Sequence, residues 1–70
     1  MPVSMAPIGR VMRVTKIVTN DEVKKHLESL GITIDSTLTV LQSSSGNVIL
    51  RVKDGKLALD RTLANKIFVA

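Results

Sequence analysis

The segment that decides the fold runs from Thr19 to Val69 and reads TNDEVKKHLESLGITIDSTLTVLQSSSGNVILRVKDGKLALDRTLANKIFV. Its first part carries apolar residues every three or four positions, which is the period of a helix. The remainder alternates apolar and polar residues in short runs separated by polar turns, a pattern typical of half-buried strands. The segment therefore predicts one helix followed by several short strands.

The helix is predicted to run from Asn20 to Leu30. Thr19 and Glu22 fit a capping box, and Val18 and Val23 then occupy the two hydrophobic-staple positions. Acidic residues in the first turn also suit the positive end of the helix macrodipole.

The far end of this helix is predicted from one glycine. An apolar stripe of Val23, Leu27 and Leu30 would face the core. Gly31 follows where a left-handed residue ends many helices, and Ile32 can contact Leu27 in a Schellman motif.

A strand is predicted before the helix, from Ile8 to Val18. Its apolar residues Val11, Val14 and Ile17 recur every three positions, so a flat strand cannot place all of them on one face. A bulge or a strong bend would reconcile them, with Met12 on the opposite side.

Three strands are predicted to form a meander after the helix, followed by a single helical turn over Arg61 to Lys66 and a last strand over Ile67 to Val69. Asp54 and Gly55 are predicted to form a two-residue hairpin turn, because a type I′ turn needs φ > 0 at both central residues. The meander strands are Thr37 to Gln42, residues 48–53 and Lys56 to Asp60, with inward residues Leu38, Val40, Val48, Leu50, Val52, Leu57 and Leu59.

Five short strands and one helix in 70 residues predict a mainly β fold of one domain, residues 1–70. Closing the sheet into a small barrel would remove its exposed edges. Ten Lys and Arg against six Asp and Glu give a net charge of +4, and the absence of cysteine excludes disulfides and thiolate metal sites. Because neither a long apolar run nor a signal-peptide pattern is present, we expect a cytoplasmic protein.

Catalytic chemistry finds no support in these residues. The serines that cluster in one turn, residues 43–45, have no histidine near them in sequence, and the glycines are isolated rather than gathered in a phosphate-binding loop. We therefore predict neither an enzyme nor a bound cofactor. Glu22 and His26, one helical turn apart, are the candidates for a metal site, which would need one or two further ligands.

Two kinds of binding stay open. Candidate contacts with an acidic protein partner lie on the helix and around the hairpin, and they are Lys24, Lys25, His26, Arg51, Lys53 and Lys56. We expect the Asp54-Gly55 hairpin to bring Arg51, Lys53, Lys56 and Arg61 close together, and these four residues could instead contact a nucleic-acid backbone. Single-strand recognition relies on aromatic stacking, and Phe68 is the only aromatic residue, so nucleic acid is the alternative rather than the main prediction.

Six short motifs follow one another along nearly the whole chain. They are MPVSMAPIG at residues 1–9, LESLGI at 27–32, LTVL at 38–41, GNVI at 46–49, LAL at 57–59 and LANKIFV at 63–69. Their order and spacing resemble the ferrous iron transport protein A (FeoA) family, in its clostridial-type stand-alone form. Members usually carry a glycine where this chain has Asp35-Ser36, and because Asp tolerates a left-handed backbone we predict that the turn is kept.

The resemblance implies a small SH3-like β-barrel of about five strands, with one α-helix after the first strand and a single helical turn before the last. It also implies a cytoplasmic accessory protein that docks on the GTP-binding part of the ferrous iron permease and modulates iron uptake. Such a protein would be peripheral to the membrane through this partner only, and no catalytic residue is carried over. A weak homodimer is compatible with the small core. The alternative is a basic SH3-like barrel that binds nucleic acid.

Overall fold

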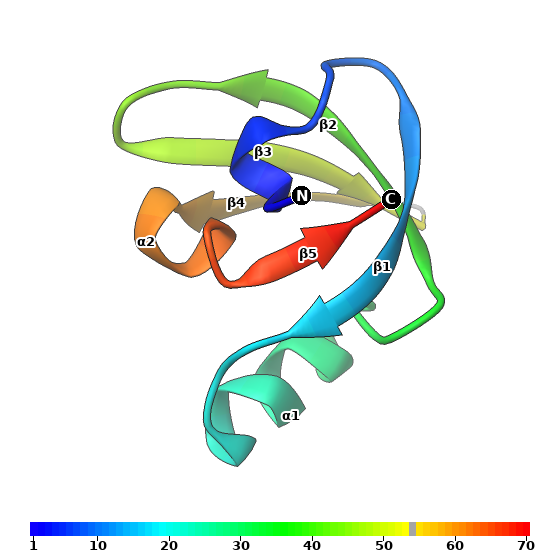
Figure 1. Ribbon diagram of the computed structural model, residues 1–70, viewed down its shortest axis with the longest axis vertical. Coiled ribbons are helices and arrows are strands. Elements are labelled where there is room, and N and C mark those ends of the chain that lie inside the picture. The colour runs from blue at the N-terminus through cyan, green and yellow to red at the C-terminus, as the bar shows by residue number, and fades with distance from the viewer. Residues whose placement is uncertain (54) are drawn as a thin grey trace.

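The computed structural model describes residues 1–53 and 55–70. The elements in chain order are a short 3-10 helix η1 (Val3–Met5), β1 (Val11–Ile17), α1 (Asp21–Ser29), β2 (Thr37–Ser43), β3 (Asn47–Val52), β4 (Gly55–Asp60), the single turn α2 (Arg61–Ala64) and β5 (Ile67–Val69) (Figure 1). The predicted series of strands, helix and helical turn is confirmed. Within the described residues, no helix has the length and hydropathy that crossing a bilayer requires.

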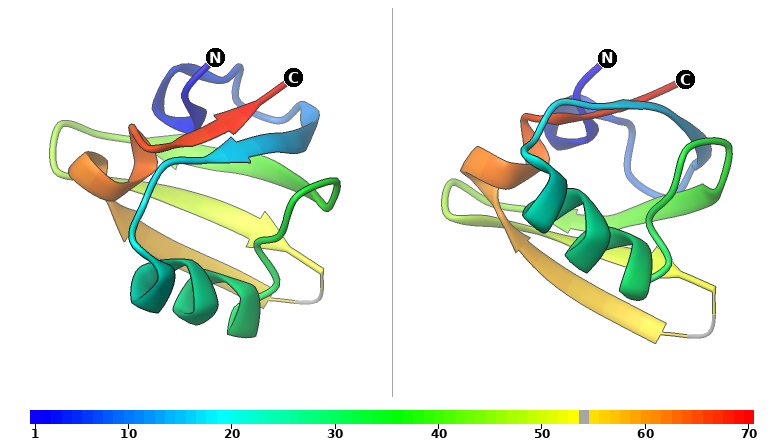
Figure 2. Two further views of the ribbon diagram at one scale, coloured as in Figure 1. Left: turned by 60° about the horizontal axis from the view of Figure 1, so that its bottom comes forward. Right: turned by 90° about the horizontal axis from the view of Figure 1, so that it is seen from below.

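The strands form one antiparallel sheet in the order β4-β3-β2-β1-β5. The sheet curls, and α1 lies at its open side, below β1 in both views of Figure 2. Within the described sheet no ladder joins β4 to β5, so the sheet is open where the sequence predicted a closed barrel. The SH3-like description still holds, because the strand order and the inserted helix are kept.

In the part of the chain that the structure describes, the N-terminal residues pair with one edge strand of this sheet, β5, and not with the other, β4. The terminal amine of Met1 donates to the Val69 carbonyl oxygen at 3.0 Å, and the Val69 amide donates to the Met1 carbonyl oxygen at 2.8 Å. Pro2 also forms a bridge with Phe68, so the N-terminal residues cover the outer edge of β5. Within the described sheet, β4 has β3 as its one strand neighbour.

One hydrophobic core fills the inside of the curled sheet. The predicted inward residues of the meander are buried, except that Leu57 is half-buried and packs against the core. The fully buried large side chains come from η1, from every strand except β4, and from α1 and the segment after it: Val3, Val14, Leu27, Ile32, Val40, Val48, Leu50, Ile67 and Val69.

Strand β1 contains the predicted bulge, but Met12 rather than Val11 faces the core. Its register with β5 shifts between Val14 and Lys16. Met12 and Val14 are buried, whereas Val11 is 67% exposed. The inward placement of Val11 was wrong, because alternation makes Met12 and Val14 share the core face before the bulge.

Helix α1 begins one residue later than predicted. The Asn20 side chain accepts a hydrogen bond from the Val23 amide at 2.9 Å, which makes Asn20 the N-cap. The Thr19 hydroxyl donates instead to the Asn20 carbonyl oxygen. The predicted capping box was wrong because Glu22 then lies at N2 rather than N3. The predicted staple also fails, since Val18 is about half exposed.

The end of α1 confirms the Schellman motif. The Ile32 amide donates to the Leu27 carbonyl oxygen at 2.9 Å, and the Gly31 amide donates to the Glu28 carbonyl oxygen at 3.0 Å. Gly31 has a φ of +95°. Leu27 and Ile32 are fully buried, but Leu30 is partly exposed, so the predicted apolar stripe includes one residue too many.

The β3–β4 hairpin turns one residue earlier than predicted. Val52 pairs with Gly55, and Lys53, which follows Val52, has a φ of +52°. Gly55 therefore lies in β4 instead of at the centre of the turn. The prediction of a positive φ at Asp54 concerns a residue outside the described ones.

Candidate interaction surface

Glu22 and His26 both lie exposed on α1. Among the described residues, no group of three or more His, Asp or Glu side chains is placed to hold a metal ion. A tetrahedral or octahedral site needs more donors than one carboxylate and one imidazole provide. The structure thus brings no third described ligand to this pair.

The three candidate contacts on α1 do not share one face. Successive helix residues are rotated by about 100°, so Lys24, Lys25 and His26 point in three directions. Lys25 and His26 are exposed, whereas Lys24, predicted to be exposed, is half-buried because it lies closer to the buried Leu27 side of the helix.

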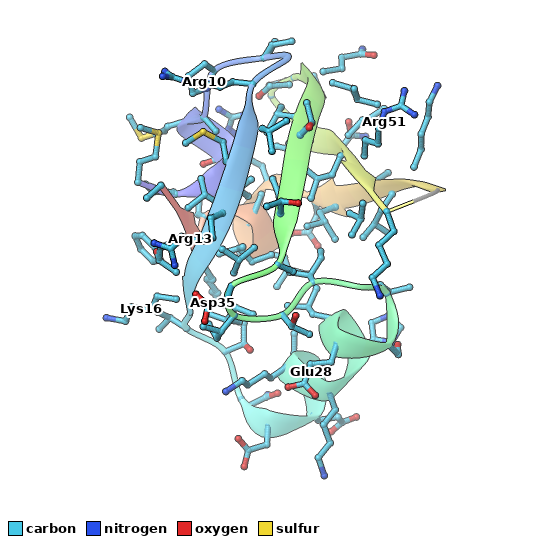
Figure 3. All side chains as sticks on the ribbon, turned by 90° about the vertical axis from the view of Figure 1, so that its right-hand side faces the viewer. Arg10, Arg13, Lys16, Glu28, Asp35 and Arg51 are labelled. Atoms are coloured by element: carbon cyan, nitrogen blue, oxygen red, sulfur yellow. The ribbon has the colours of Figure 1, made fainter. Side chains whose placement is uncertain are left out.

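Arg51 and Lys56 are the candidate residues that the structure does bring together. They are directly opposite each other in the β3–β4 ladder, and both are exposed. Side chains at such positions have Cβ atoms about 5 Å apart, and like charges there repel each other. Among the described residues the one salt bridge joins Arg13 to Asp35 at 2.7 Å, so neither member of the pair is neutralised by a described carboxylate. Figure 3 shows Arg51 across β2 from Arg13 and Asp35.

Lys53 does not join this pair on the sheet face. A Cβ placed on Gly31 would lie 3.8 Å from Lys53 Cδ and 3.0 Å from Val52 Cγ1, so the Lys53 stem lies beside the end of α1. The positive φ of Lys53 explains the change of direction, since it interrupts the alternation of the strand.

Arg61 holds three segments together and is not a free surface cation. Its Nη1 donates to Ser43 Oγ at 2.9 Å and to the Ser44 carbonyl oxygen, and its Nη2 donates to the Ser4 carbonyl oxygen at 3.4 Å. It lies at the end of β4 away from the hairpin turn. The expectation that the hairpin brings Arg61 close to Arg51 was therefore wrong.

The outer face of the sheet also carries apolar residues that were not among the candidates. Ile49 is half-buried and pairs with the exposed Ala58 on β4. On its other side Ile49 lies opposite a bulge in β2, where the register shifts between Val40 and Gln42 and Leu41 is the extra, half-buried residue. The sequence signal was the unbroken apolar runs at residues 48–50 and 57–59, which are typical of strands covered on both faces.

Asp35 keeps the left-handed turn that was predicted at this position. Its φ is +71°, as predicted, and the Ser36 amide donates to the Thr33 carbonyl oxygen across the turn at 3.1 Å. The Asp35 amide also donates to the Val14 carbonyl oxygen at 2.8 Å, which ties the turn to β1. The left-handed residue thus positions the entry to β2.

The described residues enclose no pocket. The model of the FeoA domain family matches residues 1–70. The chain belongs to the FeoA domain family. A curated protein of Methanocaldococcus jannaschii, named "Putative Fe(2+) transport protein A", is 37% identical over 68 residues, which cover 97% of this chain and 83% of that protein.

Solved structures agree with the FeoA assignment. The crystal structure of an iron uptake regulatory protein (FeoA) superposes with a TM-score of 0.89 at 28% identity, covering 99% of this chain and 93% of that one. A manganese-dependent transcriptional repressor superposes with a TM-score of 0.87 at 22% identity over 40% of its length, which shows a shared fold alone. FeoA proteins are accessory to ferrous iron transport and are not a known family of enzymes.

Proposed function

We propose that this protein is a cytoplasmic accessory of ferrous iron uptake that docks on the GTP-binding part of the ferrous iron permease and modulates it. The FeoA assignment over the full chain supports the link to iron transport. The observation that carries the docking is the exposed Arg51–Lys56 pair, whose like charges have no described carboxylate partner. An acidic partner surface would relieve this repulsion.

The first experiment is an NMR titration of the ¹⁵N-labelled protein with the isolated GTP-binding domain of the permease from the same organism. Docking predicts amide shifts that cluster on one face of the molecule. A parallel measurement of ferrous iron uptake in cells lacking this protein is expected to show reduced uptake. Unchanged uptake, together with no shifts against either the domain or the whole permease, would contradict the proposal. Salt-sensitive shifts with RNA or DNA would support the nucleic-acid alternative instead.

A further inference from the structure

We propose that the outer face of β2, β3 and β4 binds an amphipathic helix of the partner that carries carboxylates one turn apart beside its apolar stripe. This inference deepens the proposed function, on which it rests for the identity of the partner. Two rows of residues that run across the strands carry the inference.

The first row contains the cations. Register pairs join Thr39 to Arg51 and Arg51 to Lys56, and Val11 extends the row onto β1 by pairing with Thr39. Arg51, Lys56 and Val11 are exposed and Thr39 is half-buried. The row therefore presents two adjacent positive charges at one end.

The second row is mainly apolar and lies two residues away from the first on each strand. It contains Ile49, Ala58 opposite it on β4, and the β2 bulge on its other side, where the exposed Gln42 is the register partner of Ile49 and Leu41 is the extra residue. Outward positions of an antiparallel sheet are normally polar when that face is solvated. An apolar row at these positions indicates a face that another element covers.

The spacing of the two rows fits a helix that crosses the strands. Residues two apart along a strand are about 7 Å apart, and neighbouring strands are about 4.8 Å apart. A helix lying across the strands can set its apolar stripe on the Ile49 row. Acidic residues at positions i and i+4 of that helix, about 6 Å apart, then match Arg51 and Lys56, which are about 5 Å apart.

Charge decides between the possible occupants. A second copy that docks through the same face would bring Arg51 and Lys56 toward the same cations of its partner, so repulsion disfavours it. Of the described carboxylates, Asp60 at the end of β4 and Asp35 before β2 are engaged elsewhere. Asp60 accepts a hydrogen bond from the Leu63 amide at 2.7 Å, and Asp35 pairs with Arg13. An acidic helix is therefore the complement that remains.

The test uses two synthetic amphipathic helices of about 18 residues, long enough to be helical in solution. They share one apolar stripe, and they carry either Glu or Lys at the flanking i and i+4 positions. Each is titrated into the ¹⁵N-labelled full chain. We expect the Glu helix to shift the amides of Thr39, Ile49, Arg51, Lys56 and Ala58, and the Lys helix to leave them unchanged.

Charge variants sharpen this test. Lys56→Glu should weaken binding of the Glu helix about tenfold or more, as expected for reversing one of two paired charges. The same variant should raise the melting temperature by about 1–3 °C, because Glu opposite Arg51 replaces repulsion with attraction. Lys25→Glu is the matched control, since it makes the same change at an exposed helix position and should leave binding within about twofold.

The outcomes separate this inference from the proposed function. Shifts that fall on α1, equal binding of the Lys helix, or loss of binding in Lys25→Glu but not in Lys56→Glu would each overturn it. Response of this face to anionic vesicles but to neither helix would also overturn it, in favour of a membrane surface. If the Glu helix binds here and the permease domain does not, the proposed function fails while the inference stands. If the permease domain shifts other residues, the inference fails and the proposed function stands.

Discussion

At the scale of single residues, Asp35 shows how the chain keeps a glycine turn without a glycine. A left-handed backbone costs a non-glycine residue about 1 kcal/mol or more, and Asp lowers this cost through local hydrogen bonding. Asp35 also pairs with Arg13, but both side chains are more than half exposed, so the ion pair contributes little. The backbone conformation is therefore the property that a substitution should test.

We expect Asp35→Ala to lower the free energy of unfolding by about 1 kcal/mol, because alanine is strained at φ +71°. Asp35→Gly should change it by less than about 0.5 kcal/mol, since removal of the strain offsets the greater freedom of the unfolded chain. Urea unfolding of both variants measures the difference, with Arg13→Gln as the control for the ion pair. Equal destabilisation by Asp35→Gly, Asp35→Ala and Arg13→Gln would show that the ion pair dominates instead.

At the scale of elements, the beginning of α1 is set by one amide. We expect Asn20→Ala to lower the free energy of unfolding by about 1 kcal/mol, because the Val23 amide loses the acceptor that caps it. Thr19→Ala should change it by less than about 0.5 kcal/mol, since the Thr19 side chain caps no amide of the helix. Thermal unfolding followed by circular dichroism checks both. A larger loss of stability in Thr19→Ala than in Asn20→Ala would support the capping box predicted from the sequence and contradict Asn20 as the N-cap.

Arg61 acts on several elements at once. Its guanidinium joins η1, β2 and the turn before β3 from the first residue of α2. We expect Arg61→Ala to cost about 1–3 kcal/mol of stability, the range for hydrogen bonds from a charged donor that is partly buried. Lys66→Ala, at an exposed position close in sequence, should cost less than about 0.5 kcal/mol. Similar small effects in chemical denaturation of both variants would show that Arg61 is a surface cation after all.

The sequence predicted elements well and their ends less well. Gly31 could be placed because one left-handed residue ends a helix in a recognisable way. Asn20 and Thr19 are both good capping residues, so the sequence could not choose between them. Lys53 took a left-handed backbone next to the Asp54-Gly55 signal, which moved the turn by one residue. Such one-residue shifts arise because tertiary contacts select among local alternatives of similar free energy.

The candidate site was predicted only in part. The hairpin predicted that Arg51, Lys53 and Lys56 lie close together, but a turn centred on Asp54 and Gly55 would have paired Lys56 with Lys53. The structure pairs Lys56 with Arg51 instead. The apolar row around Ile49 was missed because an isolated strand pattern does not show which outward residues line up across a sheet. Arg61 was misassigned because charge alone does not distinguish a solvated cation from one that binds backbone carbonyl oxygens.

At the scale of the whole molecule, we expect the inner face of the sheet to stabilise the fold and the outer face to bind the partner. A domain of this size has a free energy of unfolding of about 4–10 kcal/mol. Leu50 is fully buried at the centre of the core, while its neighbour Ile49 is half-buried on the outer face. Adjacent residues of β3 therefore report on opposite faces.

We expect Leu50→Ala to lower the free energy of unfolding by about 2–5 kcal/mol, through lost burial and the cavity that remains. Ile49→Ala should cost only about 1 kcal/mol, because much of its side chain is already in solvent. Binding of the acid-flanked helix should follow the opposite order once only folded protein is counted, with Ile49→Ala weakening it severalfold and Leu50→Ala leaving it nearly unchanged. Urea unfolding and NMR titration of the same samples measure both quantities. Parallel losses of stability and affinity in the two variants would mean that the outer face supports the fold alone and binds nothing through Ile49.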